Sequence, residues 1–224
     1  MSAASLSQAA DIRGTIVVQR QLTRRRVTAS VGAYDRGTAV DLKKDFAEDA
    51  LAFEREHVVV YLEGDLPLET SAITGEIAQE NRRFVPDTLW IPAGSSVSFP
   101  NLDPIFHNVF SLSKPKEFDL GNYAKDHTRT VTFPKAGIVF VNCHLHPNMA
   151  AVIVIGPNPW GARVDAAGKF LLPDVPPGNY TAVAWHRSAG FFRKTVQVME
   201  NHATHLEFFI PLEANGSAKS AAER

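Results

Sequence analysis

Residues 143–149 of the chain read Cys143-His144-Leu145-His146-Pro147-Asn148-Met149, and they contain its only cysteine. A second stretch, Phe106-His107-Asn108-Val109, lies upstream and follows an Asp-Pro turn. Each stretch adjoins a run of β-branched and aromatic residues, so each is expected at the end of a strand. Together the two stretches offer a thiol, imidazoles and a thioether, which are side chains that bind transition metals.

Four of these side chains are the candidate ligands, namely His107, Cys143, His146 and Met149. A thiolate, two imidazoles and a weak axial thioether form the ligand set of a mononuclear type 1 copper centre. A tight loop with the spacing Cys-x-x-His-x-x-Met brings three ligands onto one ion, and His107 must then come from a neighbouring strand. We therefore predict one copper ion that alternates between Cu(I) and Cu(II). Asn108 is expected behind His107, as a hydrogen-bond partner that fixes the loop.

Other histidines are not expected to bind this ion. His144 is adjacent to Cys143, so its side chain should point away from the ion if strand geometry persists. A lone buried cysteine is often no more than a small apolar residue. It is the combination of Cys143 with the surrounding histidines and methionine that favours a metal site.

The rest of the chain is rich in strand signals, which predicts an all-β fold made of antiparallel sandwiches. Strands are expected at residues 15–18, 57–62, 88–91, 96–99, 107–112, 128–133, 138–142, 150–155, 169–172, 180–185, 195–198 and 206–210. Apolar residues spaced by four, four and three predict a single helix over residues 41–56, with Asp41 as its N-cap.

The order of these signals predicts two bodies. Neither flank has enough strands to fold alone, because two or three strands are marginal in isolation. We therefore expect one small sandwich built from residues 11–70 and 160–212, with residues 76–157 inserted between them. Residues 1–10 and 213–224 are small and polar, and we expect flexible tails there.

Composition excludes several functions. The net charge of the 224 residues is −1, so no basic field would recruit nucleic acid. No apolar run approaches the roughly 20 residues of a membrane span. Residues 1–10 lack the basic start and apolar core of a signal peptide, as in a mature secreted protein or a cytosolic one. A single cysteine does not settle the compartment.

The segment from about residue 76 to 155 resembles the small cupredoxins of the amicyanin and plastocyanin kind, on the residues 143–149 quoted above. This resemblance implies a Greek-key β-sandwich with the copper near one end, held by the four candidate ligands. It also implies that electrons leave through the exposed edge of His146, inside an apolar docking patch of Phe106, Leu145 and Pro147. Leu145 is a departure, since amicyanin has proline at this place.

The flanks resemble a carboxypeptidase-regulatory-like (transthyretin-like) domain. The likeness rests on Asp165-Ala166-Ala167-Gly168-Lys169-Phe170 and on the proline-rich turn over residues 172–180. The combined arrangement is similar to bacterial methylamine-utilization-like proteins. It implies a periplasmic or secreted protein whose signal peptide has been removed.

Electron transfer is the function expected first, with redox proteins as donor and acceptor. No second histidine cluster with the spacing of a copper oxidase is present, so we do not expect an enzyme. The second alternative is a copper chaperone or storage protein that would use the same site. The chain has only three methionines, and this low number argues against a Met-rich carrier of Cu(I). An adhesion or scaffold protein is the third alternative.

Overall fold

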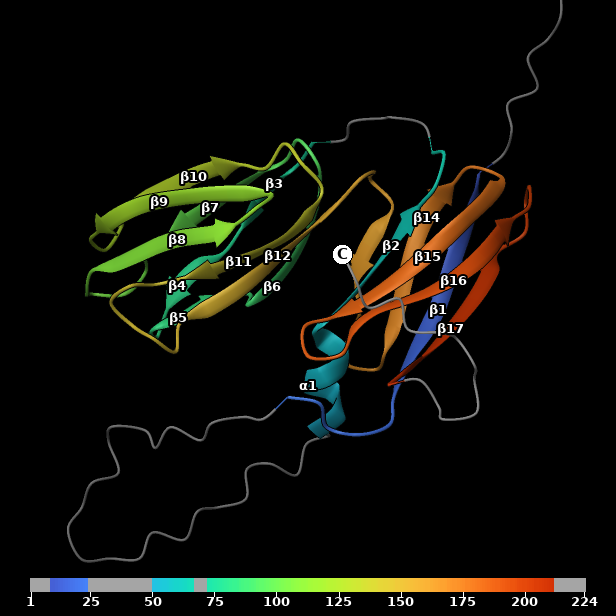
Figure 1. The fold of residues 1–224 in the computed structure, drawn as a ribbon, viewed down its shortest axis with the longest axis horizontal. Helices are drawn as coiled ribbons and strands as arrows, with labels where there is room; N and C mark the ends of the chain where they lie inside the picture. Colours follow the sequence, from blue (N-terminus) through green and yellow to red (C-terminus); the bar gives the residue numbers. More distant parts are fainter. Residues whose placement is uncertain (1–8, 24–49, 67–71, 212–224) are drawn as a thin grey trace, which may run out of the picture.

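The computed structural model describes residues 9–23, 50–66 and 72–211. Within these ranges the chain folds into β-strands and one short helix, and the strands form two layered bodies side by side (Figure 1). The all-β fold class expected from the sequence is therefore confirmed. No helix in the same ranges is long and apolar enough to cross a membrane.

Strands from both ends of the chain form the first body, which we name the flanking sandwich. Its sheets have the orders β14-β1-β17 and β13-β2-β15-β16. The strands are β1 (Ala10–Val18), β2 (Val58–Glu63), β13 (Gly161–Arg163), β14 (Lys169–Val175), β15 (Gly178–His186), β16 (Gly190–Val198) and β17 (Thr204–Ile210). Strand β1 lies between β14, which is antiparallel to it, and β17, which is parallel. The first described strand, β1, thus pairs with two strands from the C-terminal part of the chain, β14 and β17.

The residues between these flanks form the second body, the central sandwich. Its sheets have the orders β6-β12-β11-β8-β9 and β10-β7-β3, and β4 pairs with β5 as a separate hairpin. The strands are β3 (Thr74–Glu76), β4 (Ala78–Glu80), β5 (Arg83–Val85), β6 (Thr88–Pro92), β7 (Ser96–Pro100), β8 (His107–Ser113), β9 (Lys116–Tyr123), β10 (Thr128–Thr132), β11 (Gly137–Asn142) and β12 (Ala150–Gly156). Between β9 and β11 the chain crosses to the opposite sheet, as in Greek-key sandwiches.

The helix α1 (Ala50–Glu56) leads into β2 and is fixed by a buried glutamate. The Glu54 carboxylate accepts hydrogen bonds from the backbone N–H groups of Leu22 and Thr23, at 2.9 and 2.8 Å. Its other oxygen lies 3.1 Å from Nε2 of His186, at the end of β15. Burial alone would raise the pKa of Glu54, but these contacts hold that pKa below its ordinary value. The earlier part of the expected helix, with its N-cap, lies outside the described residues.

Strand β12 is buried on both faces and joins the two bodies. Ala151, Ile153 and Ile155 belong to the core of the central sandwich. Val152 and Val154 point the other way, into a cluster shared with the flanking sandwich. That cluster, which we name the seam, also contains Val59, Tyr61, Val183 and Trp185 and packs against Trp90 and Ile138. Burial on both faces explains why β12 is a continuous apolar run rather than an alternating one.

Two further contacts hold the bodies together beside the seam. His57 follows α1, and its Nε2 lies 2.7 Å from Oδ1 of Asp87, just before β6. Gly161 opens β13, where a Cβ atom would lie 2.3 Å from the indole of Trp90. Only glycine permits this close approach of the backbone to the ring without displacing it.

Candidate metal centre

Three adjacent strands bring the candidate ligands to one end of the central sandwich, which is its left-hand end in Figure 1. His107 is the first residue of β8, Cys143 directly follows β11, and Met149 directly precedes β12. Strand β11 lies between β8 and β12, with Asn142 opposite Phe110. The loop from β11 to β12 carries His146, so sheet order alone places the four residues near one another.

The ligand atoms of His107, Cys143 and His146 all lie within 4.8 Å of one another. The two Nδ1 atoms are 3.1 Å apart, and His146 Nδ1 lies 3.7 Å from the Cys143 sulfur. With metal–nitrogen bonds of about 2.0 Å and metal–sulfur bonds of about 2.3 Å, as for zinc, such atoms would be about 3.4–3.8 Å apart. These two distances agree within a few tenths of an ångström. The ligand atoms of His107 and Cys143 lie within the wider limit of 4.8 Å, so a small approach of these two side chains would let all three bind one transition-metal ion.

Met149 follows His146 in the same loop and is 1% exposed. Its side chain is buried in the same core as Cys143, and its N–H donates a 2.9 Å hydrogen bond to the carbonyl of His146. A thiol, two imidazoles and a thioether are softer donors than the oxygens that Mg²⁺ and Ca²⁺ prefer, and they suit copper.

Asp103 holds the far side of the His107 ring. Its Oδ2 lies 2.7 Å from His107 Nε2 and accepts a 2.8 Å hydrogen bond from the N–H of Arg82. Its Oδ1 accepts a 2.7 Å hydrogen bond from the N–H of Asn81. Burial acts to raise the pKa of Asp103, but these three donors together lower it, so the carboxylate remains charged.

Asn108 ties β8 to the loop that contains the cysteine. Its N–H points at the Cys143 sulfur, 3.5 Å away, and its side-chain oxygen accepts a 3.4 Å hydrogen bond from the N–H of His144. Its amide group donates a 2.7 Å hydrogen bond to Asp119. Asn108 therefore contacts both the thiol and the loop that follows it.

His146 lies between the core and the surface. Burial is the main cause that lowers its pKa, and the neighbouring His107 and Arg82 lower it further. The lowered pKa favours the neutral imidazole, which is the form that binds metals. The residues expected to form a docking patch are exposed: Phe106 is 59% exposed, Leu145 is 45% exposed and Pro147 is exposed as well.

His144 has other contacts. Its ring stacks on Phe110 with centroids 3.6 Å apart, and its Nε2 lies 3.7 Å from Asp119. Where the chain is described, the trio of His107, Cys143 and His146 is the one group of His, Cys, Asp and Glu close enough to hold a metal.

Sequence reasoning missed two residues near this centre. Asp103 was interpreted only as part of an Asp-Pro turn, and nothing in the local sequence shows that Asn81 and Arg82 would reach it. The signal that could have found it is its position four residues before His107, since metal-binding histidines commonly donate to a carboxylate. Leu102, in the same loop before β8, is a further exposed apolar residue, at 47%.

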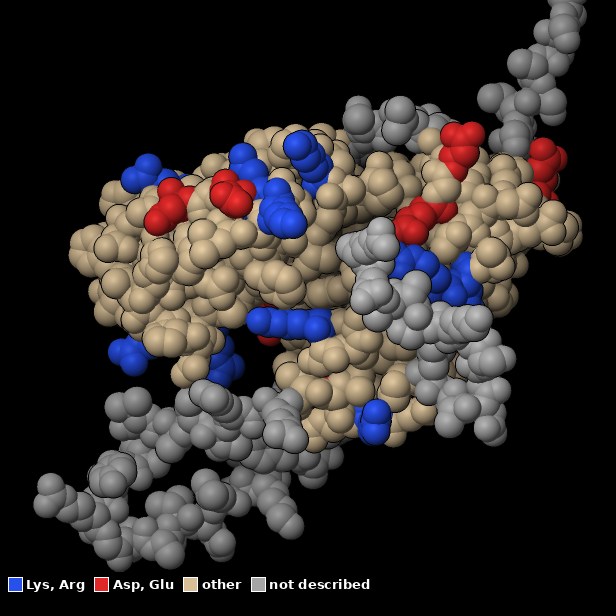
Figure 2. Space-filling view, in the orientation of Figure 1, with Lys and Arg blue, Asp and Glu red and all other residues tan. Residues whose placement is uncertain are grey.

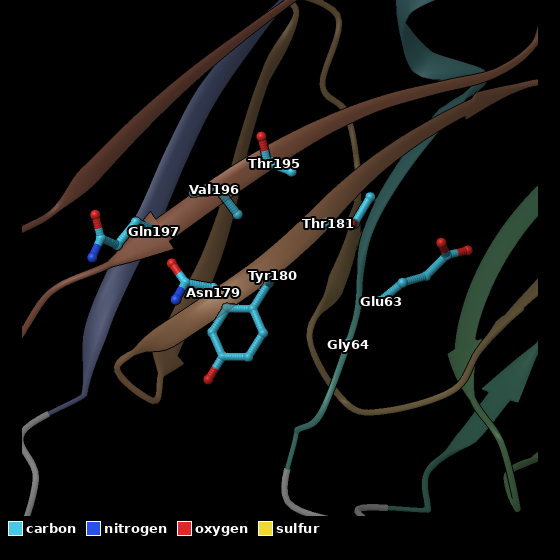
Figure 3. Close-up of a pocket in the computed structure, with 8 residues that line it drawn as sticks. All are labelled: Glu63, Gly64, Asn179, Tyr180, Thr181, Thr195, Val196 and Gln197. Atoms are coloured by element: carbon cyan, nitrogen blue, oxygen red, sulfur yellow. The ribbon is translucent and has the colours of Figure 1, made fainter.

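A hollow on the flanking sandwich offers no comparable chemistry. It has a volume of about 590 Å³ and lies on the outer face of β15 and β16, where Asn179 pairs with Gln197 (Figure 3). Its one carboxylate, Glu63, lies 3.4 Å from the guanidinium of Arg193. Amides, hydroxyls and one paired carboxylate do not form a transition-metal site.

No family model matches the chain, and no curated protein matches its sequence. Solved structures resemble part of it. A copper-containing nitrite reductase (NirK) from Thermus scotoductus SA-01 is 24% identical, with 37% of this chain and 22% of the reductase covered and a TM-score of 0.35. This chain thus spans about a fifth of the reductase's length.

Two smaller proteins are covered almost completely. A purple cupredoxin from Nitrosopumilus maritimus is 20% identical, with 37% of this chain and 99% of the cupredoxin covered and a TM-score of 0.34. A Cu(I) form of an amicyanin variant is 17% identical, with 43% of this chain and 97% of amicyanin covered and a TM-score of 0.34. Less than half of this chain is thus similar to a copper-containing reductase and to small cupredoxins.

Proposed function

We propose that this protein is a type 1 copper protein that carries single electrons between redox proteins. The observation that supports the proposal most is the convergence of His107, Cys143 and His146, with ligand atoms within 4.8 Å of one another. We assign Met149 as the axial ligand, because it lies in the same buried cluster as Cys143 and directly precedes β12. Copper bound there would supply a one-electron change between Cu(I) and Cu(II).

The protein's own contribution is to hold the ligands in place and to exclude water. His107 and Cys143 are buried, and they are fixed by Asp103 in the loop before β8 and by Asn108 in β8. A site held rigidly in this way changes little when the charge of the ion changes, which favours fast exchange of an electron. We assign no catalytic residue, and the proposal gives the chain no enzymatic turnover of its own.

We place the contact with redox partners at the surface around His146. Phe106, Leu145 and Pro147 give this surface an apolar character, which suits brief contacts that bring two redox centres close together. Charges of both signs are scattered over the face seen in Figure 2, with no large area of one sign. The exposed apolar side chains are expected to make the contact itself.

We also propose that residues 76–157 are a unit inserted into the flanking sandwich, and that the protein works in the periplasm or outside the cell. The pairing of β1 with β14 and β17 supports the insertion, because it joins strands from the two ends of the chain. The location follows the resemblance to cupredoxins described above.

The test is to load the purified protein with Cu(II) and to record its absorption and electron paramagnetic resonance spectra. A cupric–thiolate bond is expected to give strong absorption near about 600 nm with one ion per chain. Replacing Cys143 by Ser should abolish this band, and Met149→Leu should shift the reduction potential. Met199→Leu is the matched control, because Met199 is exposed.

The outcome also separates the alternatives. Reversible voltammetry with fast electron exchange supports a carrier, whereas rapid transfer of copper to a chelator with slow exchange would support copper handling. Intact colour and affinity in Cys143→Ser would show that the ligand assignment is wrong. Failure of the unmodified protein to bind copper in either oxidation state would leave the scaffold alternative.

A further inference from the structure

One buried carboxylate is shared by a candidate ligand and by a surface turn. Asp103 faces His107 Nε2 at 2.7 Å and the N–H groups of Asn81 and Arg82 at 2.7 and 2.8 Å. Its own N–H donates a 3.0 Å hydrogen bond to the side-chain oxygen of Asn101. Three contacts to a carboxylate whose side chain is 10% exposed, and a fourth to its own backbone, leave the carboxylate little freedom.

We propose that Asp103 is the positioning residue of the metal centre, which fixes the His107 ring and strengthens its Nδ1 as a donor. This inference rests on the proposed function and deepens it. Its physical basis is that the carboxylate has no hydrogen to give, so His107 Nε2 must be the donor of their hydrogen bond. The lone pair of His107 Nδ1 is then free to bind a metal together with Cys143 and His146, whose ligand atoms lie within 4.8 Å of it.

The geometry selects the ligand atom before any metal arrives. An imidazole that is free to rotate exposes either nitrogen, and each tautomer binds differently. In this site the Nε2 proton is held by Asp103, so neither the ring orientation nor the tautomer has to change on binding. A carboxylate acting through the ring also raises ligand basicity. A more basic nitrogen stabilises Cu(II) more than Cu(I), because Cu(II) carries the larger charge.

The same carboxylate supports a strained turn. Asn81 and Arg82 join β4 to β5 with φ of 52° and 56°, a region that residues other than glycine seldom adopt. The N–H groups of Asn81 and Arg82 both donate to the Asp103 carboxylate. Asp103 thus connects this turn to the Nε2 side of the His107 ring. Loss of Asp103 would therefore affect both the turn and the ligand, and its test needs readouts that separate the two.

The first measurement needs no variant and no metal. Long-range ¹H–¹⁵N correlation spectra of the metal-free protein identify which nitrogen of each imidazole carries the proton. His107 is expected as the Nε2–H tautomer, with slow exchange of this proton because the ring is fully buried. An Nδ1–H tautomer, or two tautomers in fast exchange, would overturn the proposal.

The second measurement compares Asp103→Asn with Asp126→Asn, which removes the same charge from an exposed turn at the same end of the sandwich. Losing such a partner commonly lowers metal affinity by about 10–100-fold. We expect Asp103→Asn to lose about tenfold more affinity for Cu(II) than for Cu(I), which raises the reduction potential by about 59 mV. Asp126→Asn should leave both affinities unchanged.

The readouts distinguish this inference from the proposed function. A colourless unmodified protein would refute the copper centre itself, whatever the tautomer of His107. A blue unmodified protein whose potential shifts equally in the two variants would refute the role of Asp103 alone. A purely structural role would lower the unfolding temperature of Asp103→Asn without changing the ratio of the two copper affinities, and that result would also refute it.

Discussion

Replacing Val154 by Thr tests whether the two sandwiches are packed together through β12. The exchange keeps the shape of the side chain and its strand propensity but replaces a methyl group by a hydroxyl. Val154 is 1% exposed, and its neighbours in the seam are apolar or aromatic. Burying an unpaired hydroxyl costs about 1–3 kcal/mol. The lost methyl burial adds about 0.8 kcal/mol. The free energy of unfolding should therefore fall by about 2–4 kcal/mol.

Guanidinium unfolding of the metal-free protein measures this loss from the shift in midpoint and the slope. Val85→Thr is the matched control, because Val85 is 46% exposed and the same change there should stay within about 0.5 kcal/mol. If Val154→Thr costs no more than Val85→Thr, the outer face of β12 is solvated. The seam and the two-sided burial of β12 would then both be wrong.

Two further predictions concern the same junction. Gly161→Ala places a methyl group against Trp90, and overpacking of this kind should cost about 1–3 kcal/mol in a thermal melt. A change near zero would mean that the ring has room to move aside. The ion pair of His57 with Asp87 should make stability depend on pH.

The sign of this dependence follows from the two shifts. Burial acts against the charge on each partner, but the contact raises the pKa of His57 above 6.5 and lowers that of Asp87 below 3.8. The ion pair therefore stabilises the fold at pH values between the pKa of Asp87 and that of His57. This stabilisation is lost as pH rises through the raised pKa of His57. It is also lost as pH falls through the lowered pKa of Asp87. His57→Gln should cost more at about pH 5 than at about pH 9 in urea unfolding. An equal cost at both pH values would exclude the charged pair.

Local patterns predict much of this fold. The run at residues 128–133 alternates and corresponds to β10, and the apolar run at residues 138–142 corresponds to β11. Strand β9 was missed, because Lys116–Tyr123 is mostly polar and only Phe118, Leu120 and Tyr123 pack in or against the core. The hairpin of β4 and β5 was also missed, since its turn is Asn81-Arg82 rather than a pair containing glycine.

The remaining differences come from contacts distant in sequence. An apolar run such as residues 150–155 indicates a buried strand, but not what covers its second face, which is supplied by β2 and β15. The four ligands were predicted from spacing and chemistry, and three of them converge in the structure. Asp103 could not be assigned, because its partners Asn81 and Arg82 are more than twenty residues away in sequence.

The seam also determines what would happen if the central sandwich were cut out and produced by itself. Such a fragment would expose one hydrophobic patch, and a patch of this kind favours aggregation. Its residues are Val152, Val154, Trp90 and Ile138. A soluble fragment would need hydrophilic replacements at these four places, which leave the ligand side of β12 untouched. Each sandwich thus shields an apolar face of the other from water.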